Sequence, residues 1–261
     1  MSAAAASAPI LRVEGLRKSF GGVAAVAGAT FEVVPGSMTA LIGPNGAGKT
    51  TAFDLISGFV RPDGGRITYA GRSIARRSPE TIARLGLVRT FQLTRVFRAM
   101  TVRENLLVGS QGHPGERLLR VAVRPLAAVR HERAARRDAD AMLDRFGLGS
   151  HRNELAGNLS GGQRKLVELA RVMMARPRMV LLDEPFAGVN PTLTQELLRH
   201  IAEMRGQGIT VLFVEHDLNL VMGHSEHVIV MASGSVLASG SPDLVRNDAR
   251  VLEAYIGVQA P

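Results

Sequence analysis

The chain has 261 residues, of which 46% are hydrophobic and 21% are charged, a balance typical of a globular protein. No apolar run approaches the ~18 residues that would span a membrane, and the absence of cysteine excludes disulfides, cysteine-ligated zinc and iron–sulfur clusters. The net charge of +9 could indicate nucleic acid or an anionic membrane as a partner, but aromatic residues make up only 4% and tryptophan is absent, so we expect no nucleic acid.

The first part of the chain is expected to be rich in strands. Residues 1–9 are rich in alanine and lack the basic start and long apolar core of a signal peptide, so we expect a disordered tail there. Alternating apolar and polar residues predict a strand over residues 10–16, and residues 29–34 predict another that ends at the turn Pro35-Gly36. A further strand is predicted at residues 66–69.

Residues 43–50 read Gly-Pro-Asn-Gly-Ala-Gly-Lys-Thr and fit the phosphate-loop pattern G-x-x-x-x-G-K-S/T. The apolar run 38–42 predicts a buried strand before the loop, and residues 51–57 predict a short helix after it. In such a loop, glycines let backbone N–H groups turn toward phosphate oxygens. Lys49 can reach the β- and γ-phosphates of a nucleotide, and the Thr50 hydroxyl can ligate Mg²⁺. A glycine-rich turn that binds nothing is the alternative, which the flanking strand and helix disfavour.

Residues 78–157 show a mainly helical pattern, and we expect them to form a helical subdomain inserted in an α/β core. Residues 78–80 open a short helix, residues 101–104 form a capping box, and residues 132–146 have the spacing of an amphipathic helix. The arginine-rich stretch 112–130 could grip phosphates, but a solvated surface is the better interpretation.

Strand and helix patterns alternate in the last hundred residues. Strands are predicted at residues 179–182, 209–214, 227–231 and 236–238, and helices at residues 160–175, 190–206, 218–222, after Ser241-Pro242, and at 249–256. Such alternation predicts a mostly parallel sheet with right-handed crossovers. We therefore expect one domain over residues 10–257, with its α/β core formed by residues 10–77 and 158–257.

Two further motifs carry chemistry. Asp183 and Glu184 follow a predicted buried strand, where the first can hold Mg²⁺ and the second can orient or deprotonate an attacking water. Adjacent acids at a strand end are also common surface features, and the upstream phosphate loop favours the catalytic interpretation. The motif 159–163 combines two glycines with a helix N-terminus capped by Ser160, which attracts anions. One nucleotide has no obvious need of two such sites, so we infer that this loop contacts a γ-phosphate held by a second subunit. An ordinary serine-capped helix is the alternative.

Five motifs in this order resemble those of the ATP-binding-cassette (ABC) ATPases. They are residues 43–50, 89–92, 159–163, 180–185 and 215–217. Within that family the chain is most similar to the ATPase subunits of branched-chain amino acid importers. The residues that carry this closer resemblance are 20–22, 88–92, 97–107, 187–191, 215–217, 220–222 and 253–257. The resemblance implies an α/β fold, with a P-loop NTPase core, an antiparallel β-subdomain and an inserted α-helical subdomain.

The resemblance also implies roles for individual residues. ATP would be bound by Phe20, Gly43, Pro44, Asn45, Gly46, Ala47, Gly48, Lys49, Thr50, Thr51, Ser160, Gly161, Gly162 and Gln163. The catalytic residues would be Glu184, His216 and Gln92, and the Mg²⁺ ligands would be Thr50, Gln92 and Asp183. Phe20 would stack on adenine where many relatives carry tyrosine, a change that keeps the aromatic face.

The expected function is that of an ATP-binding and ATP-hydrolysing subunit of an importer for branched-chain amino acids or related small polar solutes. Its partners would be a second ATPase subunit (the same or a different chain, arranged head to tail), separate permease subunits and, indirectly, a periplasmic solute-binding protein. These partners would place the chain at the cytoplasmic face of the inner (plasma) membrane. The alternatives are a soluble ABC ATPase of DNA repair or translation and a non-enzymatic regulatory cassette. The filled catalytic positions disfavour the last of these.

One surface is a candidate for contact with the permease. The segment 93–100 follows Gln92 and contains Leu93, Val96, Phe97 and Met100, with Phe97 as the expected anchor. These apolar side chains could instead pack inward, since apolar side chains are usually buried.

Overall fold

The computed structural model describes residues 8–90, 96–110 and 125–256, which form two compact units. Within these residues, the first unit comprises the described parts of 1–89, 178–187 and 201–261, and the second those of 90–177 and 188–200. The boundary between the units crosses helix α7 (Pro191–Gly206).

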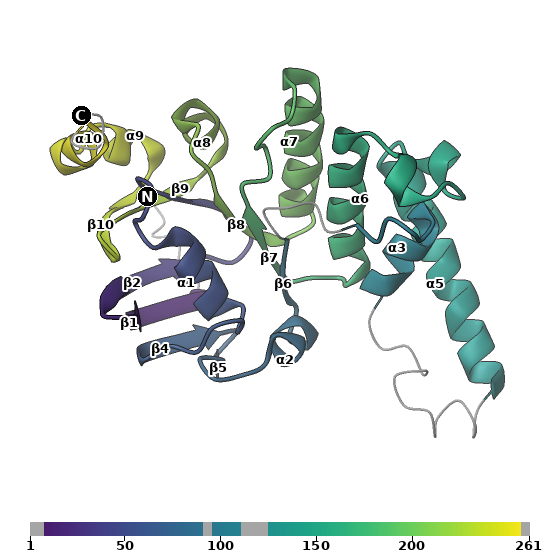
Figure 1. The fold of residues 1–261 in the computed structure, drawn as a ribbon, viewed down its shortest axis with the longest axis horizontal. Coiled ribbons are helices and arrows are strands. Elements are labelled where there is room, and N and C mark those ends of the chain that lie inside the picture. The colour runs from purple at the N-terminus through teal and green to yellow at the C-terminus, as the bar shows by residue number, and fades with distance from the viewer. Residues whose placement is uncertain (1–7, 91–95, 111–124, 257–261) are drawn as a thin grey trace, which may run out of the picture. The chain divides into compact units, whose positions relative to one another are not determined.

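A six-stranded sheet forms the centre of the first unit, in the order β10-β9-β3-β8-β7-β6 (Figure 1). Its strands are β3 (Met38–Ile42), β6 (Leu87–Arg89), β7 (Met179–Asp183), β8 (Thr210–Val214), β9 (His227–Ala232) and β10 (Ser235–Gly240). All neighbouring pairs are parallel except β9 and β10. Every residue of β3, β7 and β8 is buried, which explains their uninterrupted runs of mostly apolar residues.

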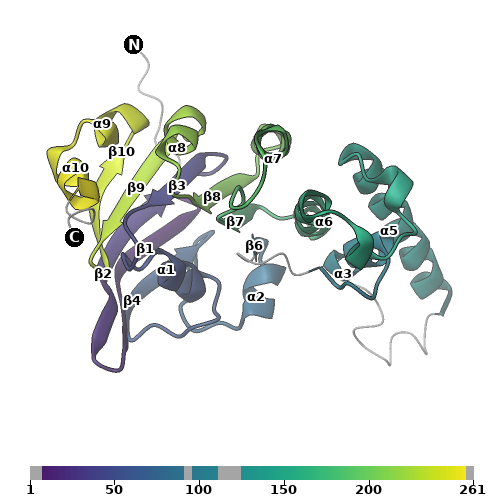
Figure 2. The same cartoon turned by 45° about the horizontal axis from the view of Figure 1, so that its top comes forward.

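A second sheet of the first unit is antiparallel, in the order β2-β1-β4-β5 (Figure 2). Its strands are β1 (Leu11–Phe20), β2 (Val23–Val33), β4 (Gly64–Tyr69) and β5 (Arg72–Ser73). Gly21 and Gly22 form the two-residue turn between β1 and β2, where both have the positive φ that such a turn requires. The two sheets are joined where the Ala27 N–H donates to the Gly234 carbonyl oxygen at 2.7 Å.

Apart from the end of α7, the described residues of the first unit contain five helices. They are α1 (Lys49–Ile56), α2 (Pro79–Arg84), α8 (Leu218–His224), α9 (Pro242–Arg246) and α10 (Ala249–Ile256). The main hydrophobic core contains side chains of α1 together with side chains of both sheets. Phe53 on α1, Tyr69 on β4 and Leu41 on β3 are among its fully buried members. The helix that follows the phosphate loop is therefore fixed against both sheets at once.

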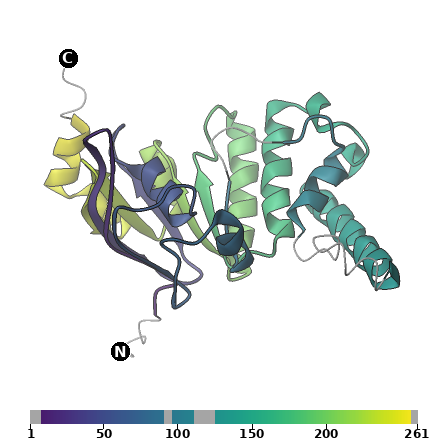
Figure 3. The same cartoon turned by 60° about the horizontal axis from the view of Figure 1, so that its bottom comes forward.

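The second unit is mainly helical (Figure 3). Its elements are α3 (Val102–Gly109), α5 (Pro125–Arg145), α6 (Gly161–Met174), two short 3₁₀ turns (Gly149–His151 and Ala156–Asn158) and the first part of α7. Helices α3, α5 and α6 pack against one another. Asn105, which is fully buried, ties the start of α3 to the turn before it: its Oδ1 accepts from the Phe97 N–H at 2.8 Å, and its Nδ2 donates to the carbonyl oxygens of Phe97 and Thr101 at 3.1 and 2.9 Å.

The expected fold class is confirmed, with both the parallel core sheet and the antiparallel sheet present. The structure differs from the sequence analysis at several elements. β2 begins at Val23 rather than at residue 29, and β5 was not predicted. β1 extends to Phe20 rather than ending at residue 16, because irregularities in its pairing interrupt the alternation. β6 lies in the segment expected to be helical. It was not predicted as a strand because three residues are too few to show a period. α5 begins at Pro125 and not at the predicted residue 132, because proline fits the first turn of a helix. The expected domain limits stay a prediction.

The buried hydrogen bonds of Asn105 generate a stability prediction. Replacing Asn105 with alanine removes the acceptor of the Phe97 N–H and one of the donors to the carbonyl oxygens of Phe97 and Thr101. We expect Asn105→Ala to lower the free energy of unfolding by about 1–3 kcal/mol, measured by denaturant titration with far-ultraviolet circular dichroism. Asn153→Ala, at an exposed position of the same unit, is the control and is expected to change little. Equal stability of the two variants would contradict the assignment.

Candidate functional site

The phosphate loop connects β3 to α1 and lies close to two other strands of the first unit. Gly43 has φ of +145°, and a Cβ atom placed there would lie 2.0 Å from the Met231 carbonyl oxygen on β9. A Cβ atom on Gly48, which has φ of +94°, would lie 2.3 Å from the Ala25 carbonyl oxygen on β2. Both positions therefore require glycine for space as well as for conformation. This cradle of small residues at the start of a helix suits the backbone approach that phosphate binding needs.

The side chain of Lys49 lies within this loop. Its ammonium group donates to the carbonyl oxygens of Gly43 at 2.7 Å and Pro44 at 2.9 Å. Burial lowers the pKa of Lys49, while the nearby carboxylates of Glu184 and Asp183 act in the opposite direction. An ammonium group in this position can exchange carbonyl oxygens for phosphate oxygens without leaving the loop.

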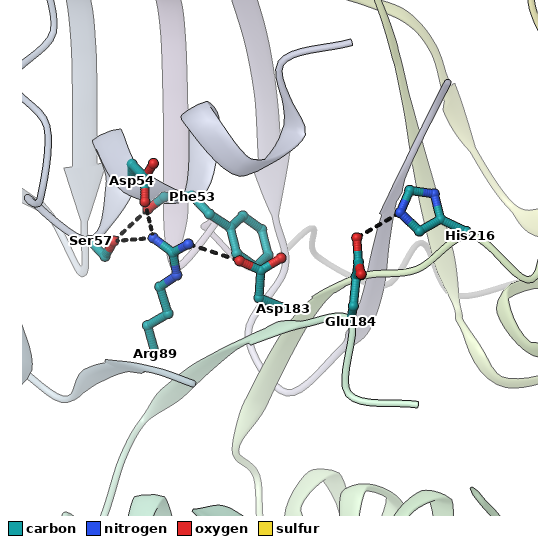
Figure 4. A network of polar contacts seen from close by, with 7 residues as sticks. All are labelled: Phe53, Asp54, Ser57, Arg89, Asp183, Glu184 and His216. Carbon is teal, nitrogen blue, oxygen red and sulfur yellow. Dashed lines mark hydrogen bonds and ion pairs between the residues drawn. The ribbon is translucent and has the colours of Figure 1, made fainter. Parts of the chain in front are cut away.

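Asp183 and Glu184 leave the end of β7 in different directions (Figure 4). Asp183 is buried; burial raises the pKa of its carboxyl group, and hydrogen bonding to Arg89 opposes that rise. Glu184 has φ of +49°, a left-handed conformation that is uncommon outside glycine. Its Oε1 lies 2.7 Å from Nε2 of His216, which follows β8. The strained backbone thus accompanies a carboxylate–imidazole pair, and such strain clusters at functional sites.

Arg89, the last residue of β6, joins the phosphate-loop helix to the end of β7 (Figure 4). One nitrogen of its guanidinium group, Nη1, lies 2.5 Å from Asp54 Oδ1 and 3.2 Å from Ser57 Oγ, both at the end of α1. The other, Nη2, lies 2.8 Å from Asp183 Oδ2. The sequence analysis included Arg89 in a motif but assigned it no role, because neither acidic partner is near it in the sequence.

Two more residues near the site were missed by the sequence analysis. Glu215 is buried and accepts the N–H groups of Phe186 at 3.0 Å and His216 at 3.1 Å, which orients the residue that contacts Glu184. Burial raises the pKa of Glu215, and these two hydrogen bonds act against the rise. On α10, burial raises the pKa of Tyr255 to about 12, and the adjacent Gly43 backbone opposes the shift. The signal for Glu215 and Tyr255 was present only as part of the family resemblance.

Three further predicted positions of the first unit are at least partly accessible. Thr50 and Thr51 lie in the first turn of α1, where Thr50 is exposed and Thr51 is half-buried. Phe20, at the end of β1, is 50% exposed, and the Lys18 ammonium lies 5.3 Å from its ring centroid. The exposed ring face could stack on a base. Gln92 lies outside the described residues.

The motif at residues 159–163 lies in the second unit, at the N-terminus of α6. The predicted capping box is present: the Ser160 side chain accepts the Gln163 N–H, and Gln163 Oε1 accepts the Ser160 N–H at 2.8 Å. A Cβ atom on Gly162 would lie 2.6 Å from a Leu193 methyl group, so this glycine also allows close approach to α7. In front of the motif is a hollow of about 570 Å³, which residues 188–190 also line. The arrangement suits an anion that comes from outside the unit. The Gln163 side chain itself is hydrogen-bonded to the Ser160 N–H at the N-terminus of its own helix.

Comparisons with known proteins agree over nearly the whole chain. The model of the family described as ABC transporter matches residues 26–187, and that of the branched-chain amino acid ATP-binding cassette transporter matches residues 235–261. The chain is 44% identical to the high-affinity branched-chain amino acid transport ATP-binding protein BraF of Pseudomonas aeruginosa, covering 96% of this chain and 99% of the relative. It is 42% identical to LivG of Escherichia coli, a protein of the same description, with the same coverage.

Two solved structures show the same fold. The ADP conformation of MJ1267, an ATP-binding cassette of an ABC transporter, has a TM-score of 0.82 and 35% sequence identity. A nucleotide-free ATP-binding cassette from an ABC transporter has a TM-score of 0.81 and 36% identity. Each comparison covers 96% of this chain and 100% of the other.

The crowded position of Gly43 generates a prediction for nucleotide binding. In Gly43→Ala the new methyl group would collide with the Met231 carbonyl oxygen, so the loop must move. We expect ATP affinity, measured by calorimetry, to fall by about tenfold or more, which corresponds to about 1.4 kcal/mol. The control is Gly36→Ala, which also has a positive φ but open space around it, and it should bind ATP normally. Unchanged affinity in Gly43→Ala would count against the loop as the nucleotide site.

Proposed function

The chain belongs to the ABC transporter family, and from that premise we propose that it is the ATP-hydrolysing subunit of an importer for branched-chain amino acids or related small polar solutes. The observation that carries the proposal is the similarity over the full length to branched-chain amino acid transport ATP-binding proteins, together with a C-terminal match to their own family model. A soluble ABC ATPase of DNA repair or translation remains the alternative, and no feature of the described residues favours it.

The geometry supports separate roles for the site residues of the first unit. Lys49 and the loop 43–48 would bind the phosphates of ATP, and Phe20 would stack on the adenine. Glu184 would accept the proton of the attacking water, and His216, 2.7 Å away, would hold its carboxylate in place and contact the γ-phosphate.

The site also fits a magnesium ion. Arg89 lies between two carboxylates, those of Asp54 and Asp183, so this group alone carries an excess negative charge. Thr50 and Asp183 offer the oxygen ligands that Mg²⁺ prefers, and Gln92 would be a third. When bound, Mg²⁺ would neutralise charge on the β- and γ-phosphates.

A second ATPase subunit would complete the site. The N-terminus of α6 carries a partial positive charge that favours an anion, and the hollow in front of residues 159–163 leaves room for one. We infer that this loop contacts the γ-phosphate bound by the other subunit in a head-to-tail pair, formed by two copies of this chain or by two different chains.

The chain would act at a membrane through other subunits. None of the helices in the described part of the chain is long and apolar enough to cross a bilayer. In the proposed importer, separate permease subunits would provide the path, a periplasmic solute-binding protein would deliver the solute, and the chain would attach at the cytoplasmic face of the inner membrane.

The surface that would contact the permease includes Phe97, Met100 and Leu155. Their exposed fractions are 46%, 38% and 46%, so Phe97 does not pack inward as the alternative in the sequence analysis supposed. The turn that carries Phe97 and Met100 is held by Asn105, and the N–H groups of Ala156 and Gly157 donate to the carbonyl oxygens of Met100 and Arg98. An aromatic side chain presented on a rigid turn is a suitable anchor for an interface. Leu93, also expected there, lies outside the described residues.

A first test of the proposed function concerns Glu184. Glu184→Gln keeps the size of the side chain but removes its basicity, so ATP hydrolysis should fall by about 10²-fold or more while ATP binding persists. Glu32→Gln, which changes an exposed glutamate paired with Arg12, is the matched control and should hydrolyse ATP normally. Near-normal turnover in Glu184→Gln would remove this residue from the catalytic role.

A second test concerns the partner surface. Phe97→Ala should leave the basal ATPase of the purified subunit nearly intact, because Phe97 lies in the second unit and is half exposed. In membranes it should weaken copurification with the permease and abolish stimulation of the ATPase by solute-loaded binding protein. Val108→Ala, at a 52% exposed position of the same unit, serves as the control. Normal assembly and transport in Phe97→Ala would place the interface elsewhere.

A further inference from the structure

Arg89 occupies a position between the elements that carry the proposed magnesium ligands. It ends β6, which pairs in parallel with β7 so that Arg89 lies opposite Leu181, two residues before Asp183. Thr50 and Asp54 are four residues apart on α1 and therefore share one face of that helix. The ion pair between Arg89 and Asp54 thus connects β6 to the helix face that also carries Thr50.

The guanidinium group is held from several sides. Only 5% of the Arg89 side chain is exposed, and Asp183 is exposed by only 2%. The guanidinium carbon lies 5.7 Å from the centroid of the Phe53 ring and 6.0 Å from that of Phe59, within the range of cation–π attraction. The Ser57 hydroxyl accepts from Nη1 while it donates to the Phe53 carbonyl oxygen. A charged group this well enclosed has little freedom to rotate.

The contacts require an arginine rather than any cation. Two different nitrogens of the group reach two carboxylates on separate elements, Asp54 at 2.5 Å and Asp183 at 2.8 Å. The planar fork of arginine can make both contacts in a fixed geometry, whereas a lysine ammonium is a point charge on a flexible stem. The bridge therefore sets the position of the Asp183 carboxylate relative to α1.

We propose that Arg89 is a positioning residue for the magnesium of Mg-ATP: it fixes the Asp183 carboxylate relative to Thr50, so that the two oxygens meet the ion at a set separation. This inference rests on the proposed function, in which Asp183 and Thr50 hold the ion. Partners that orient metal ligands are as important as the ligands themselves, and their loss typically lowers metal affinity or activity by about 10- to 100-fold.

The test separates metal-dependent from metal-independent ATP binding. ATP affinity is measured by calorimetry with Mg²⁺ and with a chelator, in a Glu184→Gln background in which hydrolysis is slow. The affinity with Mg²⁺ divided by the affinity with the chelator measures the contribution of the metal to ATP binding. Arg89→Lys should lower this ratio by about tenfold or more and leave affinity in the chelator within about twofold of the parent, because the phosphate loop itself is untouched.

Two companion variants sharpen the result. Asp54→Asn removes one arm of the bridge and keeps the contact between Arg89 and Asp183, so it should lower the ratio by a smaller factor, about threefold. Arg103→Gln breaks an ion pair of similar length in the second unit, with Asp140 at 2.7 Å, and should leave the ratio unchanged. Circular dichroism melting curves show which variants are folded.

The outcomes are distinct. A folded Arg89→Lys with the parental ratio overturns the proposal. If Arg89→Lys does not fold, Asp54→Asn decides, and an unchanged ratio there overturns the proposal as well. If the parent binds no ATP in either buffer, the proposed function fails together with the role of Arg89. If the parent binds Mg-ATP and Arg89→Lys keeps the parental ratio, only the role of Arg89 is refuted.

Discussion

The arrangement of the first unit depends on the close approach of the phosphate loop to its neighbouring strands. The backbone of Gly43 lies against the Met231 carbonyl of β9, and that of Gly48 against the Ala25 carbonyl of β2, with no space for a side chain at either position. Because β3 lies between β8 and β9 in the parallel sheet, the loop leaves the sheet at its interior. The antiparallel sheet contacts the loop as well, through Ala25 of β2. The shape of the loop is thus fixed by both sheets, and α1 follows from it with Lys49 turned inward.

Charge balance is the second constraint on this region. Two buried cations, Lys49 and Arg89, lie among three carboxylates, those of Asp54, Asp183 and Glu184. Burial penalises the charges of Lys49, Arg89 and Asp183, and pairing within the group offsets that penalty. With one negative charge in excess, the group is suited to a further cation. A magnesium ion that arrives with a nucleotide adds positive charge together with the phosphates that Lys49 and the loop would bind.

The sequence predicted those features that are encoded locally. The phosphate loop, the capping boxes at Thr101 and Ser160, and the acids after β7 depend on residues within a few positions of one another, and the structure places each as expected. The role of Arg89 could not be predicted, because its partners lie 35 and 94 residues away and meet it only once β6 pairs with β7. The buried hydrogen bond that Glu215 accepts from Phe186 was hidden for the same reason, since it joins the residue after β8 to one 29 positions earlier.

The capping box of α6 explains why the motif at residues 159–163 can serve two purposes. Within the second unit the Ser160 and Gln163 side chains satisfy each other's backbone N–H groups, so the helix end is stable without a ligand. The partial charge of a 14-residue helix remains at that end, because it comes from the aligned peptide dipoles and not from the cap alone. A surface that is stable when free and attractive to anions suits an intermittent contact with a phosphate from another chain. Such a contact would form when the other chain holds ATP opposite the loop 159–163, and it would weaken once the γ-phosphate is lost. The proposed pairing of two subunits would therefore follow the nucleotide state without any change in the fold of either subunit.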